Sequence, residues 1–331
     1  MTGPKLPTFF AGAARMNAVA GFLAAGLAGL ALAPSALAAG FCTQTADAAL
    51  TASQNDARVT FFTSKGICIN ETDAKDRTKC NADAQQAMKD DMQLAQDQHT
   101  ERLRICGLIG EDRYDPEFDR PQFVDPAKIG HGVTPNPYFP LVRGTLFTYK
   151  VKGQDQITTD LVTDKTKKID DVTCVVVEDR VKVNGVLIES TDDWFAQDLA
   201  GNVWYCGELA EVFETFKGDR PQDPELTTID GSFKADRNGD RPGLIAEASP
   251  QVGDTYYEEF SLNNAEDAAQ VVSLTASAAT PAARCNKTCL MTRNTSSIDL
   301  DVETKFYAPG VGLILEVEQD GTRNDLISVT H

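Results

Sequence analysis

The sequence has very few of the residues that form common metal centres and catalytic triads. It contains three histidines, His99, His131 and His331, and they lie far apart in the chain. Neither an H-E-x-x-H zinc motif nor a G-x-S-x-G serine hydrolase motif occurs. These absences disfavour a zinc hydrolase and a serine hydrolase. His131 lies between Gly130 and Gly132, and we expect it to be a surface loop residue.

Long apolar runs and positive charge are also scarce. After residue 38 no apolar segment approaches the roughly 20 residues that a membrane-spanning helix needs, so we expect no spanning helix there. The chain has 31 Lys and Arg residues against 49 Asp and Glu residues, a formal net charge of −18. This charge repels nucleic acid and anionic lipid, and we expect neither as a partner.

Residues 1–38 have the organisation of a secretory signal peptide. This segment contains no acid, and its two basic residues, Lys5 and Arg15, precede an apolar stretch at residues 18–33. The small-residue site Ala36-Leu37-Ala38 follows the apolar stretch. We expect cleavage after Ala38 and a soluble protein that is periplasmic or secreted. All 8 cysteines follow this segment, and an even number in an exported chain predicts disulfides.

Residues 39–110 are predicted to form an antiparallel helical hairpin. Residues 42–106 contain no proline, and from Cys80 to Cys106 apolar residues recur at helical spacing. Cys42 and Cys68 are 26 positions apart, as are Cys80 and Cys106. Equal antiparallel helices place Cys68 beside Cys80 at the turn and Cys42 beside Cys106 at the open end. We expect these two disulfides to stabilise a thin helical pair, with a different pairing as the alternative.

Residues 111–137 form a proline-rich linker, and residues 138–331 are predicted to form an antiparallel β domain. From residue 146 onward the apolar period changes from about 3.6 to 2, and Asn184-Gly185 is typical of a hairpin turn. The predicted fold class is α+β, with a helical hairpin and a β-meander of about eight to ten strands curved into a half-barrel or barrel. The expected strands are 146–152, 156–163, 172–180, 186–195, 203–208, 255–260, 270–276, 298–308 and 313–318.

Three motifs in the β domain carry a family resemblance. They are N-P-Y-F-P-L at residues 136–141, D-W-F-A-Q-D-x-x-G-N-V-W-Y-x-G-E at 193–208, and Y-A-P-G-V-G-L-I-L-E-V at 307–317. Their order resembles an uncharacterised family of exported bacterial proteins, many of them lipoproteins. The resemblance implies a β-rich periplasmic domain and brings no established activity. Cys206, Cys285 and Cys289 depart from the family pattern.

The second motif is the candidate ligand-binding site, because it gathers both tryptophans with several acids. Alternation along a strand puts Trp204 and Tyr205 on opposite faces. One is predicted to be core and the other to line the concave face; core packing for the whole block is the alternative. The candidate residues are Asp193, Trp194, Gln197, Trp204, Tyr205 and Glu208.

Asp236, Asn238 and Asp240 are candidate calcium ligands, because they place oxygen atoms at alternate positions. Gly239 comes two positions too early for an EF-hand loop, so an Asx turn is the favoured interpretation and no cofactor is expected.

The remaining cysteines, Cys174, Cys206, Cys285 and Cys289, allow a four-thiolate zinc site, but an oxidising compartment favours disulfides. Of the three possible pairings, an adjacent Cys285–Cys289 bond leaves Cys174 to Cys206.

Three classes of function remain. The favoured class is a non-enzymatic periplasmic protein that binds an apolar ligand or an envelope partner protein through the concave face of the β domain. The second is a carboxylate-based hydrolase acting on glycans, recognisable by two carboxylates about 5–9.5 Å apart. The third is a structural component of an envelope assembly that uses the hairpin as its contact element.

Overall fold

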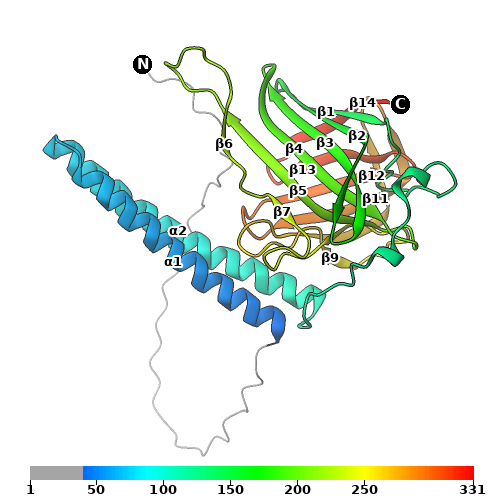
Figure 1. Ribbon diagram of the computed structural model, residues 1–331, viewed down its shortest axis with the longest axis horizontal. Helices are drawn as coiled ribbons and strands as arrows, with labels where there is room; N and C mark the ends of the chain where they lie inside the picture. Colours follow the sequence, from blue (N-terminus) through cyan, green and yellow to red (C-terminus); the bar gives the residue numbers. More distant parts are fainter. Residues whose placement is uncertain (1–39) are drawn as a thin grey trace, which may run out of the picture.

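The computed structural model describes residues 40–331, and the predicted signal peptide lies outside the described residues. Two long helices come first and a large sheet follows (Figure 1). The helices are α1 (Phe41–Ile69), α2 (Ala74–Ile109) and the short η1 (Arg120–Gln122) and η2 (Pro126–Lys128). The strands are β1 (Leu146–Val151), β2 (Gln156–Ile169), β3 (Val172–Val183), β4 (Val186–Gln197), β5 (Val203–Glu214), β6 (Glu225–Thr228), β7 (Phe233–Lys234), β8 (Gly243–Ala246), β9 (Thr255–Tyr257), β10 (Asp267–Ala279), β11 (Arg284–Ser296), β12 (Val302–Ala308), β13 (Gly312–Glu318) and β14 (Arg323–Thr330).

Helices α1 and α2 form an antiparallel hairpin that projects away from the sheet (Figure 1). The carboxylate of Asp73 caps α2, accepting hydrogen bonds from the backbone N–H groups of Lys75 at 2.8 Å and Asp76 at 3.0 Å. Gly110, at a φ of 95°, ends α2 in a conformation that favours glycine. Within residues 40–331 no helix is apolar and long enough to cross a membrane.

The hairpin is held at both ends by disulfides. Cys42 pairs with Cys106 and Cys68 with Cys80, at Cα–Cα distances of 5.6 and 5.5 Å. Between them the buried side chains of α1 are small, and the outer side of α1 leaves Phe62 exposed. The two helices therefore approach closely but bury little apolar surface, and the two covalent cross-links compensate for this.

The strands form one antiparallel sheet whose order is β6-β5-β4-β3-β2-β1-β14-β13-β12-β11-β10-β9, with β7 and β8 also paired to β5. The sheet is not closed between β6 and β9, but its edges approach each other at β8. There a side chain on Gly243 would lie 1.7 Å from the carbonyl oxygen of Glu258, so only glycine fits. This architecture confirms the predicted α+β class with a helical hairpin and a β-meander.

The predicted strand count was too low, because the sheet has 14 strands. The strands absent from the prediction are β6, β7, β8, β11 and β14. The strand predicted at 298–308 begins only at Val302, because residues 297–301 turn between β11 and β12. The physical reason is clearest in β11, whose buried face is partly polar. Thr292 and Asn294 are buried there, so the segment lacks the apolar alternation on which the prediction relied.

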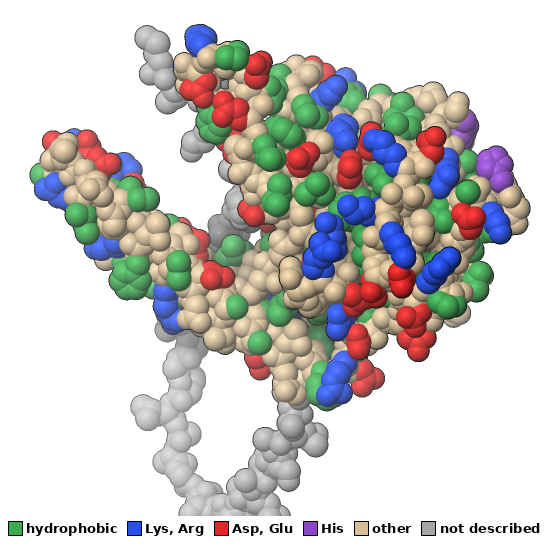
Figure 2. Space-filling view, in the orientation of Figure 1, with side chains coloured by type: hydrophobic (Ala, Val, Ile, Leu, Met, Phe, Trp, Pro, Cys, Tyr) green, Lys and Arg blue, Asp and Glu red, His purple; other side chains and the backbone are tan. Residues whose placement is uncertain are grey.

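The two faces of the sheet carry different surroundings. The inner face holds the main core, which includes Leu141, Val175 and Ile314. On the outer face, Phe118 from the segment after α2 packs beside Trp194 and the Cys174–Cys206 disulfide. Basic side chains gather over the visible side of the sheet, and the hairpin extends beyond it (Figure 2).

Candidate functional site

The structure divides the predicted aromatic block between the two faces of the sheet. Phe195 and Tyr205 lie in the main core and their rings stack at a centroid distance of 4.6 Å. Trp194 lies in the outer cluster and is only 4% exposed. Trp204 is half-buried and packs against that same outer cluster, with its Nε1 donating to Asp198 at 3.0 Å. Tyr205 is therefore the member of the predicted tryptophan–tyrosine pair that reaches the interior.

Gln197 supports the backbone around the first motif. Its Oε1 accepts a hydrogen bond from the N–H of Asn136 at 3.0 Å, and its Nε2 donates to the carbonyl of Thr134 at 2.9 Å. Asn136 is 1% exposed, and its amide in turn donates to the carbonyl of Gly201 at 2.8 Å. These contacts join the first and second motifs, which gives Gln197 and Asn136 a structural role.

A β-bulge brings Asp193, Tyr205 and Glu208 together on the inner face. Trp194 pairs with Gly207 and Phe195 with Tyr205, so β5 carries one extra residue at this point. In a regular strand, positions 205 and 208 would point to opposite faces. With the extra residue, both side chains point inward, and Asp193 lies opposite Glu208 in the register.

The Tyr205 hydroxyl connects the two carboxyl groups. It contacts Asp193 Oδ1 and lies 2.9 Å from Glu208 Oε2. A hydroxyl carries one proton and can donate it to only one acceptor, so the second contact requires a protonated carboxyl as donor. Burial raises the pKa of Glu208 to about 7, and burial together with the Glu208 charge raises the pKa of Asp193 well above its usual value.

A second acidic pair lies on the next two strands. Asp160 of β2 is opposite Asp179 of β3, and the Oδ1 atom of each is buried without a hydrogen-bond partner. Burial raises the pKa of Asp160 to about 7. Burial and the Asp160 charge raise the pKa of Asp179 to about 9. Two facing carboxyls with these pKa values hold a proton between them near neutral pH.

These acids continue into a cavity of about 230 Å³ beside the last strands of the sheet. Gly231 lines the cavity and lies beside Glu208, since a Cβ on this glycine would be 3.5 Å from Glu208 Oε1. Five acidic side chains line the cavity: Glu259, Asp267, Asp299, Asp301 and Glu303.

Lys305 is the one basic residue in the cavity lining, and it is already paired. Its Nζ lies 3.4 Å from both Glu303 and Glu316. Burial raises the pKa of Asp267 to about 6, and burial with the charges of Asp267 and Glu208 raises the pKa of Glu259 well above its usual value. The cavity therefore sets five carboxyl groups against one lysine, and its negative charge grows as the pH rises and these carboxyls lose their protons.

The predicted calcium residues form a tight turn. Asp236 and Asn238 have positive φ angles of 57° and 59°, and Asp236 Oδ1 accepts a hydrogen bond from Arg241 at 3.1 Å. Among residues 40–331, no group of three or more His, Cys, Asp or Glu side chains has a geometry that could hold a metal ion.

All the cysteines in the described residues are paired. Cys174 pairs with Cys206 and Cys285 with Cys289, at Cα–Cα distances of 6.8 and 5.4 Å, and no free cysteine remains in that part of the chain. The four disulfides fit an exported, β-rich protein.

Sequence reasoning did not single out Asp160, Asp179, Glu259 or Asp267. The available signal was an acid at an inward position of an alternating strand, such as Asp160 two residues before the buried Val162. Alternation assigns such a residue to a face, but it cannot show that acids from several strands meet there.

Comparison with known proteins identifies no family. No family model and no curated protein matches the chain. Among solved structures, a chain described as a putative lipoprotein from Parabacteroides distasonis ATCC 8503 is similar over 60% of this chain and 100% of its own length, with 12% sequence identity and a TM-score of 0.31.

Proposed function

We propose that this protein is an exported binding protein whose acid-lined cavity takes a positively charged organic ligand with more than one amino group. The observation that carries the proposal is the charge of the cavity. Five carboxyl groups surround about 230 Å³ of space, and the single lysine among the lining residues is paired with two acids. An ammonium group entering this space gains attraction from several carboxylates at once.

The exposure of the site also fits a polar ligand. Asp267 and Glu259 are half-buried, so they are partly accessible to a ligand and still partly shielded from water. Partial shielding strengthens the attraction between a carboxylate and a bound cation. The affinity should rise with pH, because the carboxyls whose pKa values are raised lose their protons.

The inner face offers less support for an apolar ligand. The apolar space there, beside Phe139, Leu141 and Phe147, measures about 70 Å³. Pockets for small organic ligands are typically about 300–1,000 Å³ in volume. The core side chains fill most of the concave face, so the cavity at the acidic end is the better candidate.

Export to the bacterial periplasm is part of the proposal. The four disulfides and the signal-like residues 1–38 support it. Cell fractionation with an antibody should recover a shortened chain beginning after Ala38 in the periplasmic fraction. Recovery of the intact chain from the cytoplasm contradicts this part of the proposal.

Calorimetric titration with spermidine tests the binding function. The double variant D299N/D301N removes two cavity charges and should weaken spermidine binding about tenfold or more. The matched variant D219N/D223N removes two exposed acids far along the chain from the cavity lining and should leave the affinity within about twofold. Equal losses in both variants indicate attraction by overall charge and contradict a cavity site.

A carboxylate-based hydrolase is the second candidate, and one observation favours it. Asp193 and Glu208 contact the same hydroxyl, so their carboxyl groups are close enough for the retaining arrangement of a glycosidase. The test is hydrolysis of chromogenic glycosides by the wild type and by E208Q. Activity that E208Q removes without lowering the melting temperature supports catalysis, and absence of hydrolysis across the glycoside series counts against it.

A further inference from the structure

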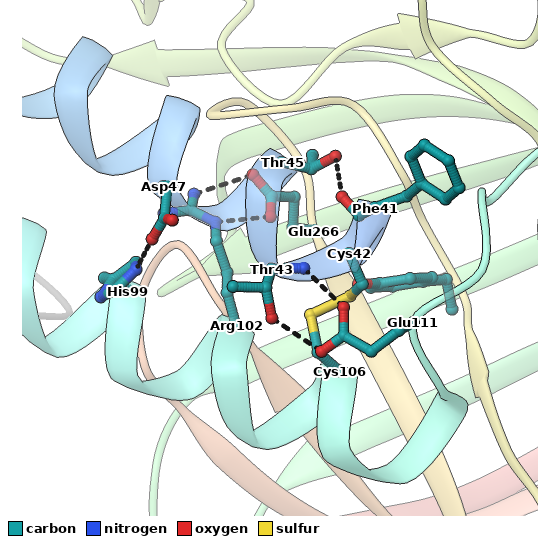
Figure 3. Close-up of a disulfide and its surroundings, with 11 residues drawn as sticks. Phe41, Cys42, Thr43, Thr45, Asp47, His99, Arg102, Cys106, Glu111 and Glu266 are labelled. Carbon is teal, nitrogen blue, oxygen red and sulfur yellow. Dashed lines mark hydrogen bonds and ion pairs between the residues drawn. A yellow bond between two sulfur atoms is a disulfide. The ribbon is translucent and has the colours of Figure 1, made fainter. Parts of the chain in front are cut away.

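A larger crevice lies where the hairpin meets the sheet. It is lined by different residues from the acid-lined cavity. It has a volume of about 470 Å³ and is lined by the start of α1, the end of α2, the residues after α2 and the region around β9. Figure 3 shows this junction, with the Cys42–Cys106 disulfide beside Arg102 and Glu266. The proposed function above makes no use of this crevice.

One wall of the crevice is aromatic. Tyr114, Tyr257 and Phe260 pack against one another, with ring centroids 4.9–5.0 Å apart. Leu262 and Phe41 also line the crevice, and each is 42% exposed. Exposed large apolar side chains beside an aromatic wall are typical of a site that receives an apolar group.

A buried arginine supplies the polar end of the crevice. Arg102 is 3% exposed, and its Nε and Nη2 each donate to a carboxylate oxygen of Glu266 at 2.8 Å. Nη2 also donates to Asn263 Oδ1 at 2.9 Å. The remaining nitrogen, Nη1, is buried without a hydrogen-bond partner. A buried charged donor without an acceptor is costly, and an oxygen anion is its strongest partner.

Two neighbouring charged residues of the lining, Glu266 and Arg241, are paired within the protein, and Arg113 lies over the Phe41 ring at 3.6 Å. Glu266 is fully engaged, since its Oε1 also accepts from the N–H of Asn263 at 2.6 Å. Arg241, another lining residue, is bound to Asp115 at 3.0 Å. The unpartnered Nη1 of Arg102 is therefore the distinctive polar feature of the crevice.

We infer that the crevice binds an amphipathic anion, with its anionic oxygen at Arg102 Nη1 and its alkyl chain along Tyr257, Phe260 and Leu262. The chemistry fits a fatty carboxylate or an alkyl phosphate, which share a compact oxygen anion on an apolar chain. The volume of 470 Å³ lies within the range of small-ligand pockets, about 300–1,000 Å³.

The test uses dodecanoate and dodecyl phosphate below their micelle concentrations, with dodecyltrimethylammonium as a control of the same chain length and opposite charge. Calorimetry of the full exported protein should show saturable binding of at least one anion and binding of the cation weaker by about tenfold or more. A preference for one anion distinguishes a carboxylate source from a phosphate source. Equal binding of the cationic detergent, or no binding of either anion, overturns the proposal.

Two matched variants locate the site. Ala48 is exposed and lines the crevice, whereas Ala52 is exposed one helical turn further along α1 and lies outside the lining. A48W should fill the crevice and weaken anion binding about tenfold or more, while A52W should leave it unchanged. Unchanged binding in A48W contradicts the assignment. R102K retains a charge beside Glu266 and should reduce the preference for anions over the cation. This variant is informative when its melting curve remains cooperative. When R102K does not fold, the A48W result decides the outcome.

Discussion

Asp160 of β2 lies directly opposite Asp179 of β3, on the inner face of the sheet, and neither Oδ1 atom has a hydrogen-bond partner. Like charges directly opposite in a sheet are destabilising unless a proton or a cation separates them. The same problem recurs on the next pair of strands, β4 and β5, where Asp193 lies opposite Glu208 with the Tyr205 hydroxyl between them. The inner face thus retains acids that reduce stability, which is typical of a functional surface.

The first prediction concerns the pH dependence of stability. The folded protein raises the pKa of Asp160 to about 7 and that of Asp179 to about 9, against about 4 for an unfolded aspartate. The folded state therefore holds more protons than the unfolded state between about pH 4 and pH 9. The free energy of unfolding should fall as pH rises through this window.

The variant D179N tests this assignment by urea denaturation at about pH 5 and pH 9. It should raise the free energy of unfolding by about 1 kcal/mol at the higher pH, where both carboxyls are charged. The effect should be much smaller at the lower pH, where the pair is protonated. D164N, at an exposed position of the neighbouring strand β2, is the control and should change neither value. A lower free energy of unfolding for D179N than for the wild type at the higher pH would show that the two carboxylates do not repel each other.

The second prediction concerns the hairpin disulfides. Peptide mapping without reduction should link Cys42 to Cys106 and Cys68 to Cys80; a Cys42–Cys68 link contradicts the hairpin.

The two disulfides should also differ in their contribution to stability. The double variant C42S/C106S opens a sequence separation of 64 residues, whereas C68S/C80S opens one of 12. The first variant should therefore lose about 1–2 kcal/mol more stability than the second, measured by denaturation followed by circular dichroism. Equal losses indicate that loop length does not determine the effect.

The third prediction separates the two faces of the aromatic block. W194A removes a side chain that is 4% exposed and should destabilise the sheet by about 3–5 kcal/mol. Y205F keeps the stacked ring and removes the hydroxyl between Asp193 and Glu208, so it should cost about 1 kcal/mol. Spermidine titration should respond to Y205F, because the neighbouring acids change their protonation, and should not respond to W204F. A change of spermidine affinity in W204F, with none in Y205F, would place the site on the outer face.

The fourth prediction concerns calcium. Asp236 is bound to Arg241, and the carbonyl of Asp240 closes the same turn by accepting a hydrogen bond from the N–H of Asp236 at 3.0 Å. We expect D240A to leave unchanged any shift of the melting temperature that millimolar calcium produces. Loss of a calcium-dependent shift in D240A, with no loss in D299N/D301N, would establish a metal site at the turn.

The helical hairpin and the antiparallel meander could be predicted because each has a local signal. Helical spacing between Cys80 and Cys106, and a period of 2 after residue 146, depend only on near neighbours in the sequence. Short edge strands such as β7, with two residues, form because β5 offers hydrogen-bond partners. Their own residues carry no such signal.

The candidate site was only partly predictable, because it depends on an insertion in one strand. Asp193, Tyr205 and Glu208 were among the predicted residues, but regular alternation puts Tyr205 and Glu208 on opposite faces. The bulge before Glu208 reverses this, and it is coupled to Gly207, where a Cβ would lie 2.3 Å from the carbonyl oxygen of Phe233. The meeting of these residues with Glu259 depends on the curvature of the whole sheet.

The central claim is that the acid-lined cavity binds organic cations, and proton release measures it most directly. A bound cation lowers the pKa of nearby carboxyls, so Asp267, with a pKa of about 6, and Glu208, with a pKa of about 7, should lose protons when spermidine binds near neutral pH. Calorimetric titrations in phosphate and in Tris, which differ in ionisation enthalpy, count those protons. The account predicts saturable binding with proton release that disappears at about pH 9. Absence of spermidine binding, or a binding enthalpy that is the same in both buffers, would contradict it.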